Sequence, residues 1–377
     1  MRHKVLVVDD SAFMRRIITD LITEDPGFAV VGTARNGEEA VRKVRELAPD
    51  VVTLDVEMPL MDGLRALEII MRECPVPVVM LSSLTDAGAR ETIRALELGA
   101  VDFVQKPSGS ISLDLHKVQR ELLDKLKAAV RARVPRAAEG AAESRPATAG
   151  GPEHRTGDRA GGREEGRTGV AAAGPHAAPD GAGGPVGRIA AIGTSTGGPR
   201  ALQTVLSALS ADFPAPILIV QHMPPVFTKS LADRLNALCA IRVREAEHGE
   251  ALEPGTAYIA PGGRHMEAER AVGGRYRIRL TDDPPVNGHR PSVDVLFDSL
   301  VPLTELKRVA VIMTGMGADG ARGLKRLLDS GAQTVAESEE TCVVYGMPRA
   351  AVNLQAARHV ARLHDIPGKL AELIREG

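Results

Sequence analysis

Two groups of residues in this sequence have the types and spacing that could support chemistry. In the first group, Asp9, Asp10, Asp55, Ser82 and Lys106 each lie at or just beyond the end of a short apolar stretch. Carboxylates that share one place raise one another's pKa unless a cation offsets their charge. Mg²⁺ is held by one or two carboxylates, and a carboxylate can then accept a phosphoryl group. The group therefore predicts a magnesium-dependent phosphoacceptor site, in which lysine and serine bind the phosphoryl oxygens.

The second group centres on Gly193 to Pro199, which reads GTSTGGP between a predicted strand and a predicted helix. The segment satisfies G-x-S-x-G, and its glycines allow a tight turn that brings Ser195 to the start of a helix. Backbone N–H groups at that position could stabilise an oxyanion. Two other interpretations remain open, namely an ordinary helix cap and a phosphate-binding turn. The segment lacks the lysine of a P-loop, however.

A nucleophilic serine needs a base, which is usually a histidine. His222 directly follows an apolar stretch, 217–221, and should lie at the same edge of a sheet as Ser195. His265 follows another such stretch and a Pro-Gly-Gly turn, whereas His289 lies in a proline-rich loop. The sequence narrows the base to His222 or His265, and we prefer His222.

The base in turn needs an orienting carboxylate. Asp319 lies in a glycine-rich turn between a strand and a helix, where it could orient the base or simply cap the helix. Asp294 and Asp298 are two other candidates for the orienting carboxylate, but their positions are typical of residues on the face of a helix. The chain order serine, histidine, aspartate also differs from the serine, acid, histidine order of α/β-hydrolases.

The elements that must position these residues alternate between strand and helix in both halves of the chain. Short apolar strands separated by helices predict parallel sheets that are covered on both faces. The carboxyl ends of parallel strands share one edge, which is where ligands bind. Alternating residues in 271–282 predict an antiparallel hairpin added to the second sheet. The other predicted strands are 4–8, 29–33, 51–54, 76–81 and 101–104, followed by 188–193, 217–221, 256–260, 309–313 and 334–337.

The composition divides the chain into three parts. Residues 131–186 contain no Leu, Ile, Met, Phe, Tyr or Trp, so they offer too little apolar surface to offset the entropy of ordering. We therefore predict a first domain at 1–127, a disordered linker at 128–186 and a second domain at 187–377. The fold class is α/β, with two doubly wound domains, a flavodoxin-like one and a Rossmann-like one.

Composition and charge also limit the possible partners. A formal net charge of −2 predicts no nucleic-acid partner. No apolar run is long enough to span a membrane or to act as a signal peptide, so we expect no membrane insertion. The three cysteines form neither a disulfide pattern nor a metal-ligand pair. We therefore expect a cytoplasmic protein.

Residues 1–127 resemble the receiver domain of two-component response regulators. The resemblance rests on Asp9-Asp10, Asp55 with the following Met58-Pro59 and Asp62-Gly63, Ser82 and Lys106-Pro107. It implies that Asp55 is phosphorylated, that Mg²⁺ is bound by Asp9, Asp10, Asp55 and the Glu57 carbonyl, and that Phe103 reorients with Ser82 and Lys106 on phosphorylation. A chemotaxis histidine kinase would be the phosphodonor.

Residues 187–377 resemble the catalytic domain of chemotaxis protein-glutamate methylesterases. The matching segments are 193–199, 220–224, 260–266, 291–294 and 313–320. The resemblance implies that Ser195, His222 and Asp319 are catalytic, that the Met316 N–H helps bind the oxyanion, and that His265 lines or supports the site. It also implies hydrolysis of glutamyl methyl esters, and deamidation of glutamines, on the cytoplasmic domains of chemoreceptors, with no cofactor for the esterase. Two alternative functions of the second domain remain open. It could be a module that only binds a protein partner, or a nucleotide-binding domain with its site at 193–199.

Overall fold

The computed structural model describes residues 2–83, 85–106, 112–132 and 186–376. Most of the predicted linker, residues 133–185, lies outside the described residues, as does Pro107. Contacts group the described residues on both sides of the linker into one compact unit. None of the described helices combines the length and the apolar composition that a membrane span requires.

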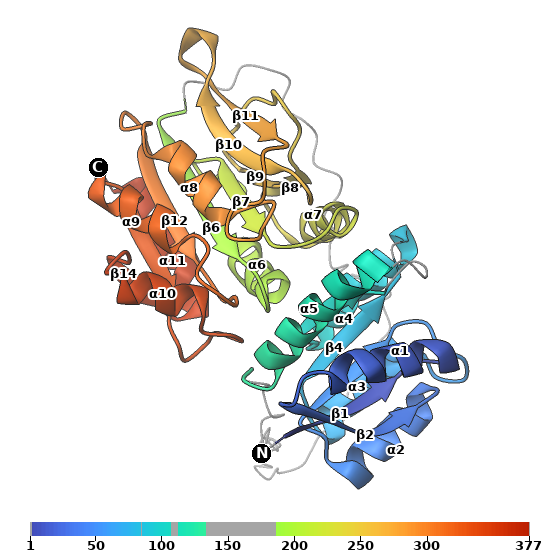
Figure 1. Ribbon diagram of the computed structural model, residues 1–377. Helices are drawn as coiled ribbons and strands as arrows, with labels where there is room; N and C mark the ends of the chain where they lie inside the picture. The colour runs from blue at the N-terminus through green and yellow to red at the C-terminus, as the bar shows by residue number, and fades with distance from the viewer. Residues whose placement is uncertain (1, 84, 107–111, 133–185, 377) are drawn as a thin grey trace, which may run out of the picture. The chain divides into compact units, whose positions relative to one another are not determined.

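The N-terminal domain is built on five parallel strands in the order β2-β1-β3-β4-β5 (Figure 1). This order confirms the predicted flavodoxin-like arrangement. Its strands are β1 (His3–Val8), β2 (Phe28–Ala34), β3 (Val51–Asp55), β4 (Val78–Ser82) and β5 (Asp102–Gln105), and its helices are α1 (Ala12–Thr23), α2 (Gly37–Leu47), α3 (Gly63–Glu73), α4 (Asp86–Leu98) and α5 (Ser112–Ala129).

Both faces of this sheet are covered because successive strand residues point to opposite sides. In β1, Leu6 and Val8 join one apolar cluster, which includes residues of α2, α3 and α4. Val5 and Val7 join another cluster, which includes residues of α1 and α5. Each of these four β1 side chains is fully buried. The hydrophobic stretches of the sequence are therefore strands that are buried on both sides, as predicted.

The C-terminal domain contains a sheet of seven parallel strands in the order β14-β13-β12-β6-β7-β9-β8 (Figure 1). The strands are β6 (Arg188–Thr194), β7 (Ile217–Gln221), β8 (Arg242–Glu245), β9 (Thr256–Ile259), β12 (Lys307–Ile312), β13 (Gln333–Glu337) and β14 (His359–Ala361), and the helices are α6 (Gly198–Ser207), α7 (Phe227–Leu238), α8 (Val293–Leu300), α9 (Ala321–Asp329), α10 (Met347–Asn353) and α11 (Ile366–Arg375), with short 3-10 turns η1 (Val272–Gly274) and η2 (Leu363–Asp365).

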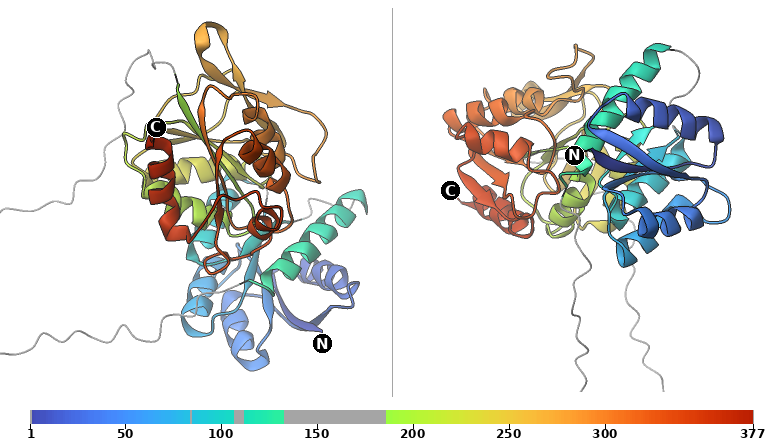
Figure 2. Two further views of the ribbon diagram at one scale, coloured as in Figure 1. Left: turned by 90° about the vertical axis from the view of Figure 1, so that its left-hand side faces the viewer. Right: turned by 60° about the horizontal axis from the view of Figure 1, so that its bottom comes forward.

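The predicted hairpin forms, but it does not extend the main sheet. Strands β10 (His265–Arg270) and β11 (Tyr276–Thr281) pair with each other in a separate two-stranded antiparallel sheet (Figures 1 and 2). The apolar side chains of this ribbon, including Met266 and Ile278, pack into the same apolar cluster as α8. Packing of one face on a helix thus replaces edge pairing with the sheet.

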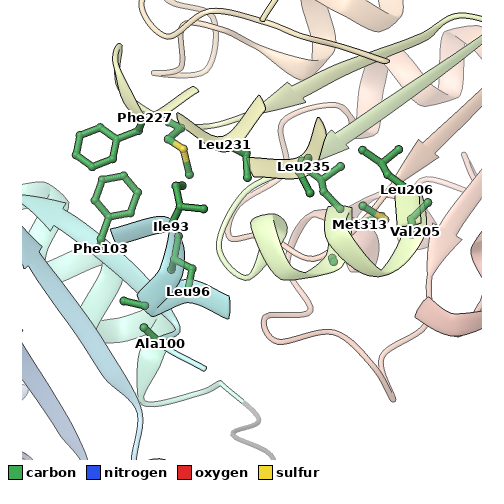
Figure 3. Packing of buried hydrophobic residues seen from close by; sticks show 14 of the residues in the cluster. Ile93, Leu96, Ala100, Phe103, Val205, Leu206, Phe227, Leu231, Leu235 and Met313 are labelled. Atoms are coloured by element: carbon green, nitrogen blue, oxygen red, sulfur yellow. The ribbon is translucent and has the colours of Figure 1, made fainter. Parts of the chain in front are cut away.

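Apolar side chains of the two domains contact each other. The rings of Phe103, on β5, and Phe227, on α7, stack with centroids 4.4 Å apart (Figure 3). Ile93 of α4 belongs to the same cluster, as does Leu231 of α7. A bidentate ion pair between Arg234 of α7 and Glu97 of α4 flanks these side chains, with its shorter N–O distance at 2.7 Å.

The core of the C-terminal domain generates a first testable prediction. Phe297 on α8 is fully buried and faces α9. The two helices are so close that a Cβ added to Gly323 of α9 would lie only 2.8 Å from the Cβ of Phe297. We expect Phe297→Ala to lower the free energy of unfolding by about 3–5 kcal/mol, because a close-packed site cannot collapse around the cavity.

Urea unfolding followed by far-UV circular dichroism measures this change. The matched control is Val272→Ala, at a side chain that is 98% exposed, and it should shift the free energy of unfolding by less than about 0.5 kcal/mol. If Phe297→Ala were as mild as the control, the described packing of α8 on α9 would be wrong.

Candidate active site and phosphoacceptor site

The first group of predicted site residues meets at the point where the strand order of the N-terminal sheet reverses. Strands β1 and β3 are neighbours there, and each ends in carboxylates. Asp9, Asp10 and Asp55 offer oxygen atoms that all lie within 4.8 Å of one another. Hard oxygen donors at this spacing suit a small divalent cation such as Mg²⁺. The residues present therefore fit the metal that the sequence predicts.

Lys106 joins this group from the end of β5. Its Nζ lies 2.8 Å from Asp9 Oδ2 and 2.7 Å from Asp55 Oδ2. The pKa of Asp55 is raised to about 6, because burial and the charge of Asp9 raise it by more than the hydrogen bond and charge of Lys106 lower it. One cation thus serves two buried carboxylates, and the site keeps an excess of negative charge.

The other predicted residues of the phosphoacceptor domain are Glu57, Ser82 and Phe103, and each has a different environment near Asp55. A cavity beside Asp55 is lined by Glu57 and Ser83, among others. The hydroxyl of Ser82 instead accepts a hydrogen bond from Thr92 Oγ1 at 2.7 Å and is buried under α4. Phe103 is buried, and the Lys125 ammonium lies 4.7 Å from its ring centroid.

The second group also meets where a strand order reverses. From β6 the chain continues to β7 on one side and later returns to β12 on the other side. The turns after β6 and β12 are joined directly: Ser195 N donates to Thr314 O at 3.0 Å, and Thr314 Oγ1 donates to Thr196 O at 2.9 Å. Ligands of doubly wound sheets bind at such a crevice.

Ser195 lies in the turn but does not cap the helix that follows. Helix α6 has Gly197 as its N-cap, with a φ of 79° and no side-chain capping hydrogen bond. The cap interpretation of the serine therefore fails. Two backbone N–H groups of the turn, those of Ser195 and Gly198, already donate to Thr314 O and Ser195 O. The turn is thus a poor phosphate cradle, which disfavours the nucleotide-binding alternative.

The side chain of Gln221 approaches the backbone of Gly198 so closely that this position of the motif requires glycine. A Cβ on Gly198 would lie 1.9 Å from Gln221 Oε1. The amide of Gln221 is buried and donates to Ser195 O at 3.0 Å and to His222 O at 3.1 Å. Gln221 thereby fixes the backbone of the serine relative to that of the histidine.

The strand register brings His222 beside Ser195. Thr194 pairs with Gln221 across β6 and β7, so Ser195 and His222 form the next pair, and His222 N donates to Thr194 O at 3.2 Å. Neighbouring strands lie roughly 5 Å apart. Among the described residues, however, no hydrogen bond joins the Ser195 hydroxyl to the His222 ring. Such contacts are often long before substrate binds.

The His222 ring is oriented by Asp319, since its Nε2 lies 2.8 Å from Asp319 Oδ2. A carboxylate can only accept, so Nε2 carries the proton and Nδ1 keeps the free lone pair. Nδ1 is buried and has no hydrogen-bond partner among the described residues. The ring therefore has one nitrogen held by the acid and the other available to take a proton.

The Asp319 carboxylate accepts further hydrogen bonds. Val293 N donates to it at 2.7 Å, Ser292 Oγ at 2.8 Å and Asn287 Nδ2 at 3.1 Å. Burial alone would raise the pKa of Asp319, but the hydrogen bonds from His222, Val293 N and Ser292 outweigh it and hold the pKa below its ordinary value. Asp319 is thus ionised across the physiological range.

The other interpretation of Asp319, as a cap of α9, is not supported. The N-cap of α9 is Gly320, and it makes no side-chain capping hydrogen bond. The carboxylate instead binds the free N–H groups at the start of α8, where the helix dipole favours a negative charge.

The structure also separates the rivals for base and acid. His265 Nδ1 accepts from Ser292 N at 3.2 Å and its Nε2 faces Pro284 O at 3.2 Å, so both ring nitrogens are engaged. Asp294 accepts from Gly323 N at 2.6 Å and from Asn287, whereas Asp298 pairs with Arg326 at the surface. Neither aspartate contacts the His222 ring in the described contacts.

Met316 lies in a loop whose backbone is fixed by hydrogen bonds to the two residues that precede it. Gly315 O accepts from Gly346 N at 3.1 Å and from Met347 N at 2.9 Å. The buried Glu337 accepts from Thr314 N at 2.8 Å, and burial raises the pKa of this carboxyl. The loop therefore has a fixed backbone next to Ser195, and the Met316 N–H makes no hydrogen bond with the described residues.

Sequence reasoning missed the residues that support the proposed base and acid. Gln221 immediately precedes His222, so its place next to the proposed base could have indicated a supporting role. Asn287-Gly288 is a turn signature, but nothing nearby indicated that the turn reaches the site. Glu337 looked like an ordinary strand end. The structure adds these supporting residues: Gln221, Asn287, Ser292 and Glu337. It also brings His289, which the sequence placed only in a proline-rich loop, against the His222 ring.

Family models match both halves of the chain. The family model for CheB methylesterase matches residues 190–370, and the model for the response regulator receiver domain matches residues 5–116. The solved structure of the Thermotoga maritima CheB methylesterase catalytic domain is similar, with 45% identity, a TM-score of 0.49, and coverage of 50% of this chain and 99% of that chain.

Two relatives match along nearly the whole length. A protein-glutamate methylesterase/protein-glutamine glutaminase of Geobacillus kaustophilus is 52% identical over 374 residues, which is 99% of each chain. One of Halalkalibacterium halodurans is 49% identical over 363 residues, which is 96% of this chain and 95% of the relative. The chain therefore belongs to the CheB family of protein-glutamate methylesterases/protein-glutamine glutaminases, with a response regulator receiver domain in front of the methylesterase domain.

Proposed function

We propose that the protein is a phosphorylation-activated serine hydrolase that removes methyl groups from glutamyl esters of chemoreceptors and deamidates certain glutamines. The observation that carries the proposal is the 2.8 Å contact between His222 and Asp319, at a sheet edge where Ser195 is the neighbouring residue. Relatives with this activity in their names are about 50% identical along the chain, which supports the same substrate class.

In the first half of the reaction, the Ser195 oxygen attacks the ester carbonyl carbon while His222 Nδ1 takes the hydroxyl proton. The carbonyl oxygen becomes an oxyanion, which the Met316 N–H would stabilise. His222 then gives its proton to the methoxy oxygen, methanol leaves, and an acyl-serine remains. Asp319 stabilises the imidazolium during these steps because it stays ionised.

In the second half, water attacks the acyl-serine and His222 Nδ1 takes one of its protons. That proton returns to Ser195 as the glutamate is released. A glutamine side chain would follow the same course, with ammonia as the leaving group and the same tetrahedral oxyanion. The chemistry of both halves needs only groups of this chain, water and the substrate.

The phosphoacceptor domain would control this site. Asp55 is the proposed phosphoryl acceptor, and a chemotaxis histidine kinase is the proposed donor. Mg²⁺ would be held by Asp9, Asp10, Asp55 and the Glu57 carbonyl, and its charge would offset that of the phosphoryl oxygens when it is bound. Lys106 would pair with the phosphoryl group. Such a partner set suits a cytoplasmic protein, as the sequence predicts.

A route from Asp55 to the hydrolase site is supported by contacts near Ser195. Thr196 Oγ1 donates to Asp102 Oδ2 at 2.5 Å, and Asp102 adjoins the buried Phe103. The ring of Phe103 in turn stacks on Phe227 (Figure 3). We propose that these contacts restrain the nucleophile turn until phosphorylation moves Phe103.

The nucleophile assignment predicts the behaviour of Ser195→Ala. Methanol release from methylated receptor should fall by at least about 10³-fold, because no acyl-enzyme can form. Phosphorylation of Asp55 by a small phosphodonor should be unchanged. The matched control is Ser210→Ala, an exposed serine outside both sites, which should keep the rate of the unaltered protein. A Ser195→Ala variant that still turned over would refute the assignment.

The control by phosphorylation predicts the behaviour of Asp55→Asn. A small phosphodonor with Mg²⁺ should raise methanol release by the unaltered protein but not by this variant, because the amide cannot accept a phosphoryl group. The assay compares initial rates with and without phosphodonor. Removal of Mg²⁺ by a chelator should abolish the stimulation and leave the unstimulated rate intact. Stimulation that persists in Asp55→Asn would place the phosphoacceptor elsewhere.

A further inference from the structure

One tight turn reaches the proposed base and acid from the side. Val286 and His289 exchange both backbone hydrogen bonds, at 3.0 and 2.9 Å. The two residues between them have positive φ angles, 53° for Asn287 and 82° for Gly288. This is the two-residue hairpin loop that Asn-Gly favours, because both central residues must adopt a left-handed conformation. The turn fixes the directions of Asn287 and His289 together.

Asn287 contacts the acid. Its amide nitrogen donates to Asp319 Oδ1 at 3.1 Å and to Asp294 Oδ2 at 2.9 Å. Its amide oxygen accepts from Arg322 at 2.6 Å. Since a carboxylate accepts and a guanidinium donates, this network fixes which way the amide points. Asn287 thus bridges two carboxylates that would otherwise repel each other.

His289 contacts the base. Its ring stacks on the ring of His222 with centroids 3.8 Å apart and planes at 5°. Asp319 holds the His222 ring only at Nε2, so rotation about that contact is limited by what covers the ring faces. A flat ring packed parallel on one face opposes tilting of the His222 ring out of its plane.

We propose that the turn 286–289 is a positioning element of the hydrolase site, in which Asn287 orients the Asp319 carboxylate and His289 holds the plane of the His222 ring. The inference rests on the proposed function, since it assigns His222 and Asp319 to catalysis. His289 and Asn287 act through these two residues and need not touch the substrate.

The charges around His289 agree with a neutral stacking partner. The pKa of His289 is lowered to about 4, because burial and the charges of His222 and Lys125 lower it by more than Asp319 raises it. Arg290, next in the chain, turns its guanidinium to the carbonyls of residues 282 and 283. The ring therefore stays neutral at neutral pH and adds no second positive charge when His222 becomes protonated.

The kinetic test uses the full-length protein and methylated receptor. His289→Ala should lower kcat by about tenfold with KM changed less than about twofold, because the base is misplaced while substrate contacts remain. His289→Phe restores a flat ring and should return kcat to within about threefold of the unaltered protein. Asn287→Asp keeps a residue that tolerates positive φ but adds a third carboxylate, and it should lower kcat by at least about tenfold.

His364→Ala is the matched control, because this histidine is exposed on η2 and should leave kcat unchanged. Equal kcat for His289→Ala and the unaltered protein would overturn the proposal. So would a His289→Phe variant as slow as His289→Ala. Ser195→Ala in the same assay reports on the proposed function separately, since its full activity would refute that function whatever the turn variants do.

A pH measurement tests the stack without activity. In the unfolded chain His289 takes up a proton near pH 6.5, but the folded ring does so only near pH 4. Lowering the pH from 7.5 to 5 therefore favours the unfolded state, and stability is lost as pH falls through this window.

The His289→Phe variant has no such proton to bind. Its melting temperature should therefore rise relative to that of the unaltered protein as the pH falls from 7.5 to 5, with each protein measured by circular dichroism at both pH values. A difference between the two melting temperatures that does not depend on pH would show that the ring is not held neutral in the stack and would overturn the proposal.

Discussion

The proposed hydrolase site depends on keeping one buried carboxylate ionised. An uncompensated carboxylate in a protein interior would take up a proton, because desolvation disfavours its charged form. Asp319 avoids this because it accepts hydrogen bonds from an imidazole, a hydroxyl, an amide and the backbone N–H groups at the start of α8. Three separate segments must therefore be in place before the proposed base is oriented: the turn after β12, the start of α8 and the loop before it.

The proposed phosphoacceptor site also lies at the carboxyl edge of a parallel sheet, but its carboxylates are not saturated with hydrogen-bond donors. Its carboxylates have few donors, and Lys106 is shared between Asp9 and Asp55. The pKa of Asp55 is therefore raised by burial, whereas the hydrogen bonds to Asp319 hold its pKa below the ordinary value. An excess of negative charge suits a site that binds a divalent cation, whereas the saturated carboxylate of Asp319 suits a site that must hold an imidazolium. The two sites use the same residue type, and the number of hydrogen-bond donors around each aspartate distinguishes their proposed roles.

The positions of the predicted site residues could be read from the sequence because strand ends are local features. Apolar stretches followed by Asp9, Asp55, Ser195 and His222 mark the carboxyl edge of a parallel sheet, and this edge was predicted correctly. The preference for His222 over His265 agrees with the ring contacts, which leave only the former with a free nitrogen.

What the sequence did not reveal depends on contacts between distant segments. The hairpin β10–β11 was expected to extend the sheet, but alternation of residues predicts a strand and not its partner. Likewise, Asn287-Gly288 announces a tight turn, and only tertiary packing brings that turn to Asp319. Glu337 supports the loop after β12 through one backbone contact, which has no sequence signature.

The hydrogen bond from Thr196 to Asp102 has a consequence for how a signal could travel between the domains. Thr196 is joined to Ser195 by a single peptide bond, and Asp102 is joined in the same way to Phe103. The path from the aromatic side chain to the proposed nucleophile therefore crosses one noncovalent link. Loss of this one hydrogen bond would therefore disconnect the two segments along this path.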